Sequence, residues 1–262
     1  MHFYADTPKG VEPRHKVLNA KASKEAGKDV YRDSRMSDAK KALKDKGEVW
    51  FPSVTTVMDI LAKPALVNWK VDQHLKAART INPIDRLPPR TEEDYIREVK
   101  RLTKIEMDKA PDAGTDFHQR MEDYIKHGMV PDEWVGLCAN VAKVIERETG
   151  ATMSEWTAEH NFVSPLGYGG QIDLLVPNWT IDFKTKQLTS KFKPGKMCYE
   201  DHSRQLSAYR EGVSKPKNKV ANVFVCLEDG QIDFHEHKEE DLQKGWSIFQ
   251  HALAIWKLQA GL

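Results

Sequence analysis

The segment GGQIDLLVPNWTIDFKTK, residues 169–186, decides how the chain folds. It contains two short apolar runs, Gln171–Val176 and Trp179–Lys184, separated by the turn-forming dipeptide Pro177-Asn178. This pattern predicts two consecutive β-strands joined by a tight turn. Each run also carries one aspartate, which is unusual because burying a carboxylate without a partner is costly.

These two aspartates, Asp173 and Asp182, indicate possible chemistry. Side chains alternate between the faces of a strand, so we expect Asp182 and Lys184 on one face and Ile181 and Phe183 on the other. A divalent cation is a natural partner for two carboxylates, which suit Mg²⁺ or Mn²⁺. A lysine beside that cation can stabilise negative charge growing on a phosphate. A surface hairpin with an Asp–Lys pair has the same pattern, and the hairpin alone does not separate the two interpretations.

The segments around the hairpin predict an α/β core. Thr152–Val163 alternates as a strand does, and Val220–Leu227 and Gln231–His237 flank an Asp-Gly turn typical of a hairpin. Glu200–Gly212 and Glu239–Leu258 have apolar residues at helical spacing. The order of these elements predicts a central mixed β-sheet flanked by helices.

The N-terminal part differs in character. Residues 1–50 are predicted to form a basic, loosely structured arm, and residues 51–150 a helical extension that forms a wall of a cleft. Residues 151–262 are the α/β core, continuous with the helical region. The proline-rich stretch 81–90 is expected to be a linker or lid loop. Helices are predicted at Val54–Leu61 (capped by Ser53), Ala65–Arg79, Tyr95–Ile105 (after a Thr91/Asp94 cap), Asp112–His127 and Pro131–Thr149.

Composition excludes several classes of protein. The chain has 262 residues and only three scattered cysteines, Cys138, Cys198 and Cys226, which rules out a disulfide scaffold and a four-cysteine cluster. Apolar runs are too short to span a bilayer, and no secretory signal is visible at the N-terminus. We therefore expect a soluble cytoplasmic protein without a membrane partner.

The formal net charge of +1 conceals two basic islands. Lys9–Lys46 contains twelve Lys and Arg against six Asp and Glu, and Lys184–Lys219 contains ten against three. Such islands can steer a polyanion to one place, although any single charge run also fits a solvated helix face. The second island surrounds the predicted catalytic hairpin.

Two further motifs lie on predicted helices. Upstream, GTDFH places the small Gly114 one turn before His118 on the same helical face. Downstream, QLSAY places Gln205 and Tyr209 one turn apart on another. An amide and a phenol can hold phosphate oxygens or stack a base, although each motif alone also fits an ordinary amphipathic helix.

Taken in order, G-x-x-x-H, I-D, I-D-x-K and Q-x-x-x-Y resemble the RecB-like branch of the PD-(D/E)XK nuclease superfamily. The entry segment FPSVTTVMDILAKPALVNWK, residues 51–70, resembles the N-terminal signature of the mitochondrial genome maintenance exonuclease and related phage nucleases. The resemblance covers about residues 50–212. It implies a restriction-endonuclease-like core.

The resemblance also implies roles for individual residues. His118, Asp173 and Asp182 would bind the metal with the backbone carbonyl of Phe183, and Lys184 would be the catalytic lysine. Glu159 matches a further acidic position of the site. The nucleic acid would be contacted by Gln205, Tyr209, Lys186 and Arg204.

The function implied is a metal-dependent DNA exonuclease of phage origin that acts on single strands or ends in replication, recombination or repair. Its location would then be the host cytoplasm, and a recombination or replication protein is a candidate partner. The alternatives are a structure-specific endonuclease on the same core, a lapsed nucleic-acid-binding module, and an interaction protein in which Asp173, Asp182 and Lys184 form a structural ion network. The cofactor would be Mg²⁺ or Mn²⁺, with no iron–sulfur cluster and, in the absence of a phosphate-binding motif, no nucleotide cofactor.

Two histidines, His235 and His237, alternate on the last predicted strand with Glu236 between them. This spacing fits a second metal site, but the solvent-exposed face of a hairpin is the favoured interpretation.

Overall fold

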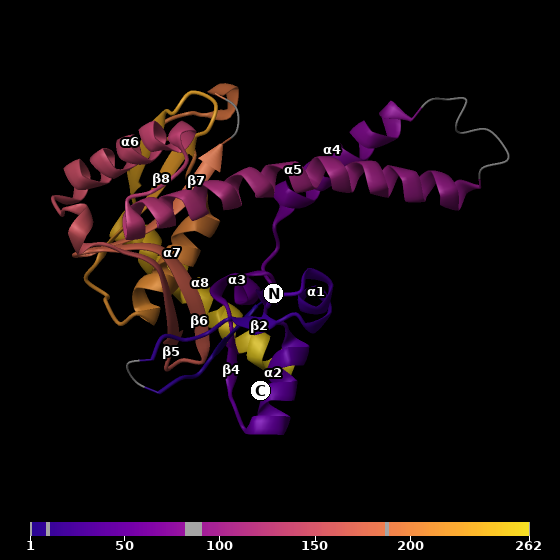
Figure 1. Ribbon diagram of the computed structural model, residues 1–262, viewed down its shortest axis with the longest axis horizontal. Coiled ribbons are helices and arrows are strands. Elements are labelled where there is room, and N and C mark those ends of the chain that lie inside the picture. Colours follow the sequence, from indigo (N-terminus) through magenta and orange to yellow (C-terminus); the bar gives the residue numbers. More distant parts are fainter. Residues whose placement is uncertain (1, 9–10, 82–90, 187–188, 262) are drawn as a thin grey trace. The chain divides into compact units, whose positions relative to one another are not determined.

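The computed structural model describes residues 2–8, 11–81, 91–186 and 189–261 (Figure 1). The chain forms two compact units, one made of residues 1–61 and 120–262 and the other of Ala62–Gln119. Most of the stretch predicted as a linker or lid loop, 82–90, lies outside the described residues. Within the described residues, no helix has both the length and the apolar character needed to cross a membrane.

The second unit is built from α4 (Pro64–Thr80) and most of α5 (Glu92–His127). The predicted cap of α5 is confirmed, because the Thr91 backbone N–H donates to Asp94 and the Asp94 N–H donates to the Thr91 hydroxyl. The sequence predicted two helices with a break before Asp112, whereas α5 is continuous. Proline removes one helical hydrogen bond, and a helix with apolar periodicity on both sides can continue through that loss.

The N-terminal residues are more ordered than the sequence predicted. Strand β1 (Phe3–Ala5) pairs with β4 (Trp50–Pro52), and its Phe3 and Tyr4 are only 1% and 2% exposed. The expectation of a loosely structured arm was therefore wrong for this part, because a three-residue strand is too short to show a periodic pattern. The other elements are β2 (Lys16–Leu18), α1 (Ala20–Ala26), β3 (Tyr31–Asp33), α2 (Met36–Lys46) and α3 (Val54–Met58).

The first unit contains the expected mixed sheet flanked by helices. Five strands lie in the order β5-β6-β7-β8-β9, and every neighbouring pair is antiparallel except the parallel pair β7–β8. A parallel pair needs a crossover connection, which here contains α7. The strands are β5 (Thr157–Ser164), β6 (Tyr168–Val176), β7 (Trp179–Lys186), β8 (Lys219–Cys226) and β9 (Ile232–Glu236); the helices are α6 (Asp132–Thr149), α7 (Glu200–Gly212) and α8 (Glu239–Ala260), with short 3-10 turns at Met153–Glu155 and Thr189–Lys191.

Helix α7 packs closely across β5 to β8 and also contacts α8. The close approach requires Gly212, because a Cβ atom there would lie 2.1 Å from the Phe162 ring. The apolar residues of β8 are buried on both faces of the sheet, which is typical of a central strand with a parallel neighbour. The packing fixes α7 directly above the strand that carries Asp182 and Lys184.

Candidate active site

The two aspartate-bearing strands, β6 and β7, part where the carboxylates lie. Their backbone pairing runs from Val176↔Trp179 to Leu174↔Ile181. Beyond that point the Phe183 N–H donates to Asp173 Oδ2 at 2.7 Å. The carboxylate thus takes the place of a backbone acceptor, as a buried N–H requires. A side chain that ends a sheet ladder in this way is held at a fixed place.

The second acid, Asp182, forms a buried ion pair. Lys184 Nζ lies 2.5 Å from Asp182 Oδ2, and the two side chains are 29% and 3% exposed. Burial alone would lower the pKa of Lys184, but the charges of Asp182 and Asp173 outweigh it and raise this pKa above its ordinary value. The lysine therefore carries its positive charge. The burial of Asp182 also excludes the interpretation of an exposed surface hairpin.

A third residue, Asn222, holds the same carboxylate. It is the β8 neighbour of Asp182, and its Nδ2 donates to Asp182 Oδ2 at 2.7 Å. Asn222 is fully buried and also contacts His237 Nε2 through its Oδ1 at 2.7 Å. The sequence pattern did not reveal this residue. Its one signal was an amide in an otherwise apolar strand, KVANVFVC.

Glu159 lies opposite Asp173. Register pairs Ala158 with Leu174 and His160 with Ile172, so Glu159 faces Asp173 across β5 and β6, with carboxylate oxygens within 4.8 Å of each other. Glu159 has a φ of 54°, in the left-handed region. A non-glycine residue there costs on the order of 1–3 kcal/mol and is often found at functional sites. Glu159 lies on strained backbone and Asp173 accepts from the Phe183 N–H, so both carboxylates are held in place. Two carboxylates this close together are suited to a hard cation.

His118 belongs to the second unit, close to its end at Gln119, on α5. Its ring is edge-on to that of Phe117, which is fully buried. Helix α5 itself continues into the first unit. The role of His118 as a metal ligand stays a prediction from the sequence.

On α7, Gln205 joins two of the predicted site residues. Its Oε1 lies 3.5 Å from Lys184 Nζ, and its Nε2 donates to the Tyr209 hydroxyl at 3.0 Å. Tyr209 is only 5% exposed and packs edge-on against Phe162. The sequence placed both side chains toward an open cleft. The structure instead puts the Tyr209 ring in the core, because the same helical face also covers the sheet.

The two remaining predicted nucleic-acid contacts differ from each other. Lys186 follows Lys184 on the same face of β7, and its Nζ lies 5.9 Å from the Tyr199 ring centre. Burial, followed by the charges of nearby lysines, lowers its pKa. Arg204, by contrast, forms ion pairs with Glu200 and with Asp201 on its own helix.

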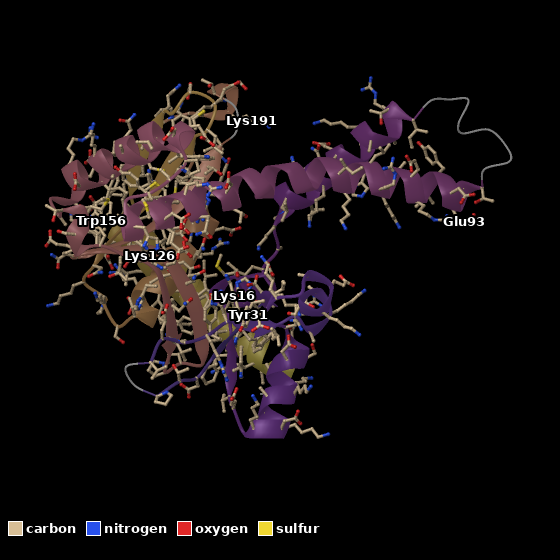
Figure 2. The ribbon with its side chains drawn as sticks, in the orientation of Figure 1. Lys16, Tyr31, Glu93, Lys126, Trp156 and Lys191 are labelled. Atoms are coloured by element: carbon tan, nitrogen blue, oxygen red, sulfur yellow. The ribbon has the colours of Figure 1, made fainter. Side chains whose placement is uncertain are left out.

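An open hollow of about 370 Å³ lies beside Glu159. Lys16 and Lys126, both labelled in Figure 2, line it, as does Arg14. Arg14 and Lys16 belong to the first basic island, but no pattern in the sequence indicates that Lys126, far along the chain, lies beside them. The lining also holds the acids Glu12, Glu122 and Glu159, and Lys126 pairs with Glu122, so the hollow is of mixed charge.

No protein-family model matches the sequence, and a search of curated proteins finds no match. Among solved structures, the crystal structure of a "Putative exonuclease" from Eubacterium rectale is similar, with a TM-score of 0.39, 13% identity and coverage of 55% of this chain and 66% of that one. The chain thus spans just under two thirds of that protein's length. A structure called SSO0001 has a TM-score of 0.27, 12% identity, and coverage of 55% and 74%. Likeness this low identifies neither family nor activity, so function is inferred from the site's own residues.

Proposed function

We propose that the protein is a metal-dependent DNA exonuclease with a RecB-like PD-(D/E)XK core. One observation carries the proposal. Where β6 and β7 part, Asp173 lies beside Glu159, and Asp182 is buried against Lys184. Two close carboxylates, with a third paired to an ammonium on the neighbouring strand, form a donor set for a hard cation and a phosphate.

The donor set fits Mg²⁺ or Mn²⁺, because carboxylate oxygens are the ligands that these ions prefer. We assign Asp173, Asp182 and Glu159 to the cation, joined by His118 and the Phe183 carbonyl as the resemblance implies. When bound, the ion would polarise the scissile phosphate and lower the pKa of a water.

The remaining residues would bind the DNA and stabilise its negative charge. Lys184, charged and 29% exposed, is available to stabilise a phosphate oxygen as negative charge develops. Gln205 contacts the Lys184 ammonium and is itself held by Tyr209, so the pair positions the lysine. Arg14, Lys16 and Lys126, in the mixed-charge lining of the hollow, would contact DNA phosphates in competition with Glu48 and Glu122, which pair with Arg14 and Lys126.

Digestion of end-labelled DNA tests the proposal. The purified protein should degrade linear single- or double-stranded DNA with Mg²⁺ or Mn²⁺, should spare circular DNA, and should stop in EDTA. Asp173→Asn should abolish cleavage while DNA binding remains. Asp201→Asn, a change to an acid on α7 that pairs with Arg204, should cleave as the parent does.

Four results would contradict the proposal in different ways. Cleavage in EDTA would exclude a metal nuclease. Nicking of circular DNA would favour the endonuclease. DNA binding without cleavage under every metal condition would favour the lapsed module, and neither binding nor cleavage would leave the acids as a structural ion network.

A further inference from the structure

A second group of residues able to bind a metal lies in the first unit. It is separate from Asp173, Asp182 and Glu159, which together are called the carboxylate site. Cys198 comes just before α7, His235 lies on β9, and His237 directly follows that strand. Their ligand atoms all lie within 4.8 Å of one another, and Cys198 Sγ is 3.9 Å from both ring nitrogens of His237. The sequence favoured a solvent-exposed face for the two histidines, but His237 is only 6% exposed.

Hydrogen bonding fixes which nitrogen of His237 can bind a metal. Asp182 accepts from the Asn222 amide nitrogen, so the Asn222 oxygen must face His237 Nε2 at 2.7 Å. That nitrogen is therefore the donor, and Nδ1 keeps its lone pair. Metal-binding histidines commonly donate their other ring N–H to such an oxygen, which orients the ring.

The segment that carries the cysteine is also held in place. The Gly195 N–H donates to Asp233 on β9 at 2.8 Å, three residues before Cys198. Met197, beside the cysteine, is buried in an apolar cluster with Phe224 of β8. The sulfur and the two rings therefore come from segments already packed against one another.

We propose that Cys198, His235 and His237 form a zinc-binding site. One thiolate and two imidazoles suit Zn²⁺, which takes sulfur and nitrogen ligands in tetrahedral geometry. Typical Zn–S and Zn–N bonds of about 2.3 and 2.0 Å place such ligand atoms roughly 3.6 Å apart. The 3.9 Å separation of Cys198 and His237 needs only a small adjustment. Cys198 and His235 are partly exposed, so the ion has access, and water would complete the tetrahedron.

The proposed zinc would hold the start of α7 to the end of β9. It would also orient His237, which contacts Asn222 and, through it, Asp182. This site differs from the carboxylate site in its donor atoms, so the two are expected to take different ions. The inference does not depend on nuclease activity.

Cobalt binding tests the proposal on the full chain after treatment with EDTA. One equivalent of Co²⁺ per chain should saturate a thiolate-to-cobalt charge-transfer band in the near ultraviolet, with visible bands of a tetrahedral ion. One equivalent of Zn²⁺ should remove these bands, and a large excess of Mg²⁺ should not. Cys198→Ser should abolish the charge-transfer band, and His235→Ala should weaken Co²⁺ binding at least tenfold.

Matched variants separate this site from adventitious binding. Cys138→Ala removes another thiol, His251→Ala an exposed imidazole on α8, and Asp173→Asn a carboxylate of the other site; all three should keep the parental bands. Circular dichroism melting confirms that each variant is folded. Absence of a charge-transfer band in the folded parent, its persistence in Cys198→Ser, or its loss to Mg²⁺ would overturn the proposal.

Discussion

Asn222 on β8 donates its amide proton to Asp182 Oδ2 on β7, directly across the parallel strand pair. Both residues are nearly inaccessible, at 0% and 2% exposure. A buried acceptor that loses a donor costs about 1–3 kcal/mol, and Asp182 keeps Lys184 as a partner, so Asn222→Leu should lower the free energy of unfolding by about that amount. Asn222→Asp should cost more, because it places a second carboxylate beside Asp182. Urea denaturation measures both, with the exposed Asn140→Leu as control. Equal stability of parent and Asn222→Leu would contradict the role of this contact.

The left-handed backbone of Glu159 should reverse the usual order of stability between glycine and alanine at this position. At an ordinary strand position, glycine is less stable than alanine by roughly 0.5–1 kcal/mol. At a φ of 54°, alanine is strained and glycine is not, so Glu159→Gly should be more stable than Glu159→Ala by about 1 kcal/mol. The same pair of changes at the exposed Thr157, on the same strand, should show the ordinary order. Thermal unfolding of the four variants checks this, and the ordinary order at both positions would mean that Glu159 is unstrained.

Asn222 and Glu159 show which features of the site could be predicted from the sequence and which could not. The hairpin of β6 and β7, the shared face of Asp182 and Lys184, and the sheet with its helices followed from local periodicity and turn chemistry. The opposition of Glu159 to Asp173 and the contact of Asn222 with Asp182 depend on register between strands. Register is fixed by tertiary packing, which a local pattern does not reveal.

The N-terminal strands and the buried histidine show a related difficulty. Phe3–Ala5 forms a strand only because Trp50–Pro52, far along the chain, pairs with it. His237 has the same alternating spacing whether its strand edge is exposed or covered. Its burial depends on the segment before α7, which shows no periodicity of its own.

The hollow beside Glu159 predicts a salt effect on DNA binding. If Lys16 and Lys126 each neutralise one phosphate, replacing both with alanine should weaken binding of single-stranded DNA. Each lost contact should reduce the slope of log affinity against log salt by about 0.7, giving a change of roughly 1.4 for the pair. Fluorescence anisotropy at several salt concentrations measures the slope. Lys143→Ala, on the exposed side of α6, should leave it unchanged, and an unchanged slope in the double variant would place the DNA path elsewhere.

The lowered pKa of His202 predicts that the folded protein loses stability in acid. Burial, followed by the charge of Lys184, lowers its pKa from 6.5 to about 3. Between these values the unfolded chain holds a proton on His202 that the folded chain does not. Its contribution to stability is therefore complete above pH 6.5 and is lost as the pH falls toward 3. In His202→Gln, the slope of unfolding free energy against pH in this window should fall by the amount that corresponds to about one bound proton. Urea titrations in EDTA test this, and parallel slopes would contradict it.

The bridge formed by Gln205 gives a prediction about rate. Gln205 contacts Lys184 and is held by the Tyr209 hydroxyl, so both α7 residues position the ammonium. Misplacing a reacting group by about 1 Å can cost on the order of a hundredfold in rate. Gln205→Ala should slow cleavage strongly, and Tyr209→Phe, which removes only the hydroxyl that accepts from Gln205, should slow it less. The double variant should be no slower than Gln205→Ala, because the hydroxyl acts through the amide.

Single-turnover cleavage of labelled DNA measures all three, with Gln243→Ala on α8 as a control that should keep the parental rate. Multiplicative losses in the double variant would show that Tyr209 acts independently of Gln205, and parental rates in all variants would assign the pair to helix packing alone.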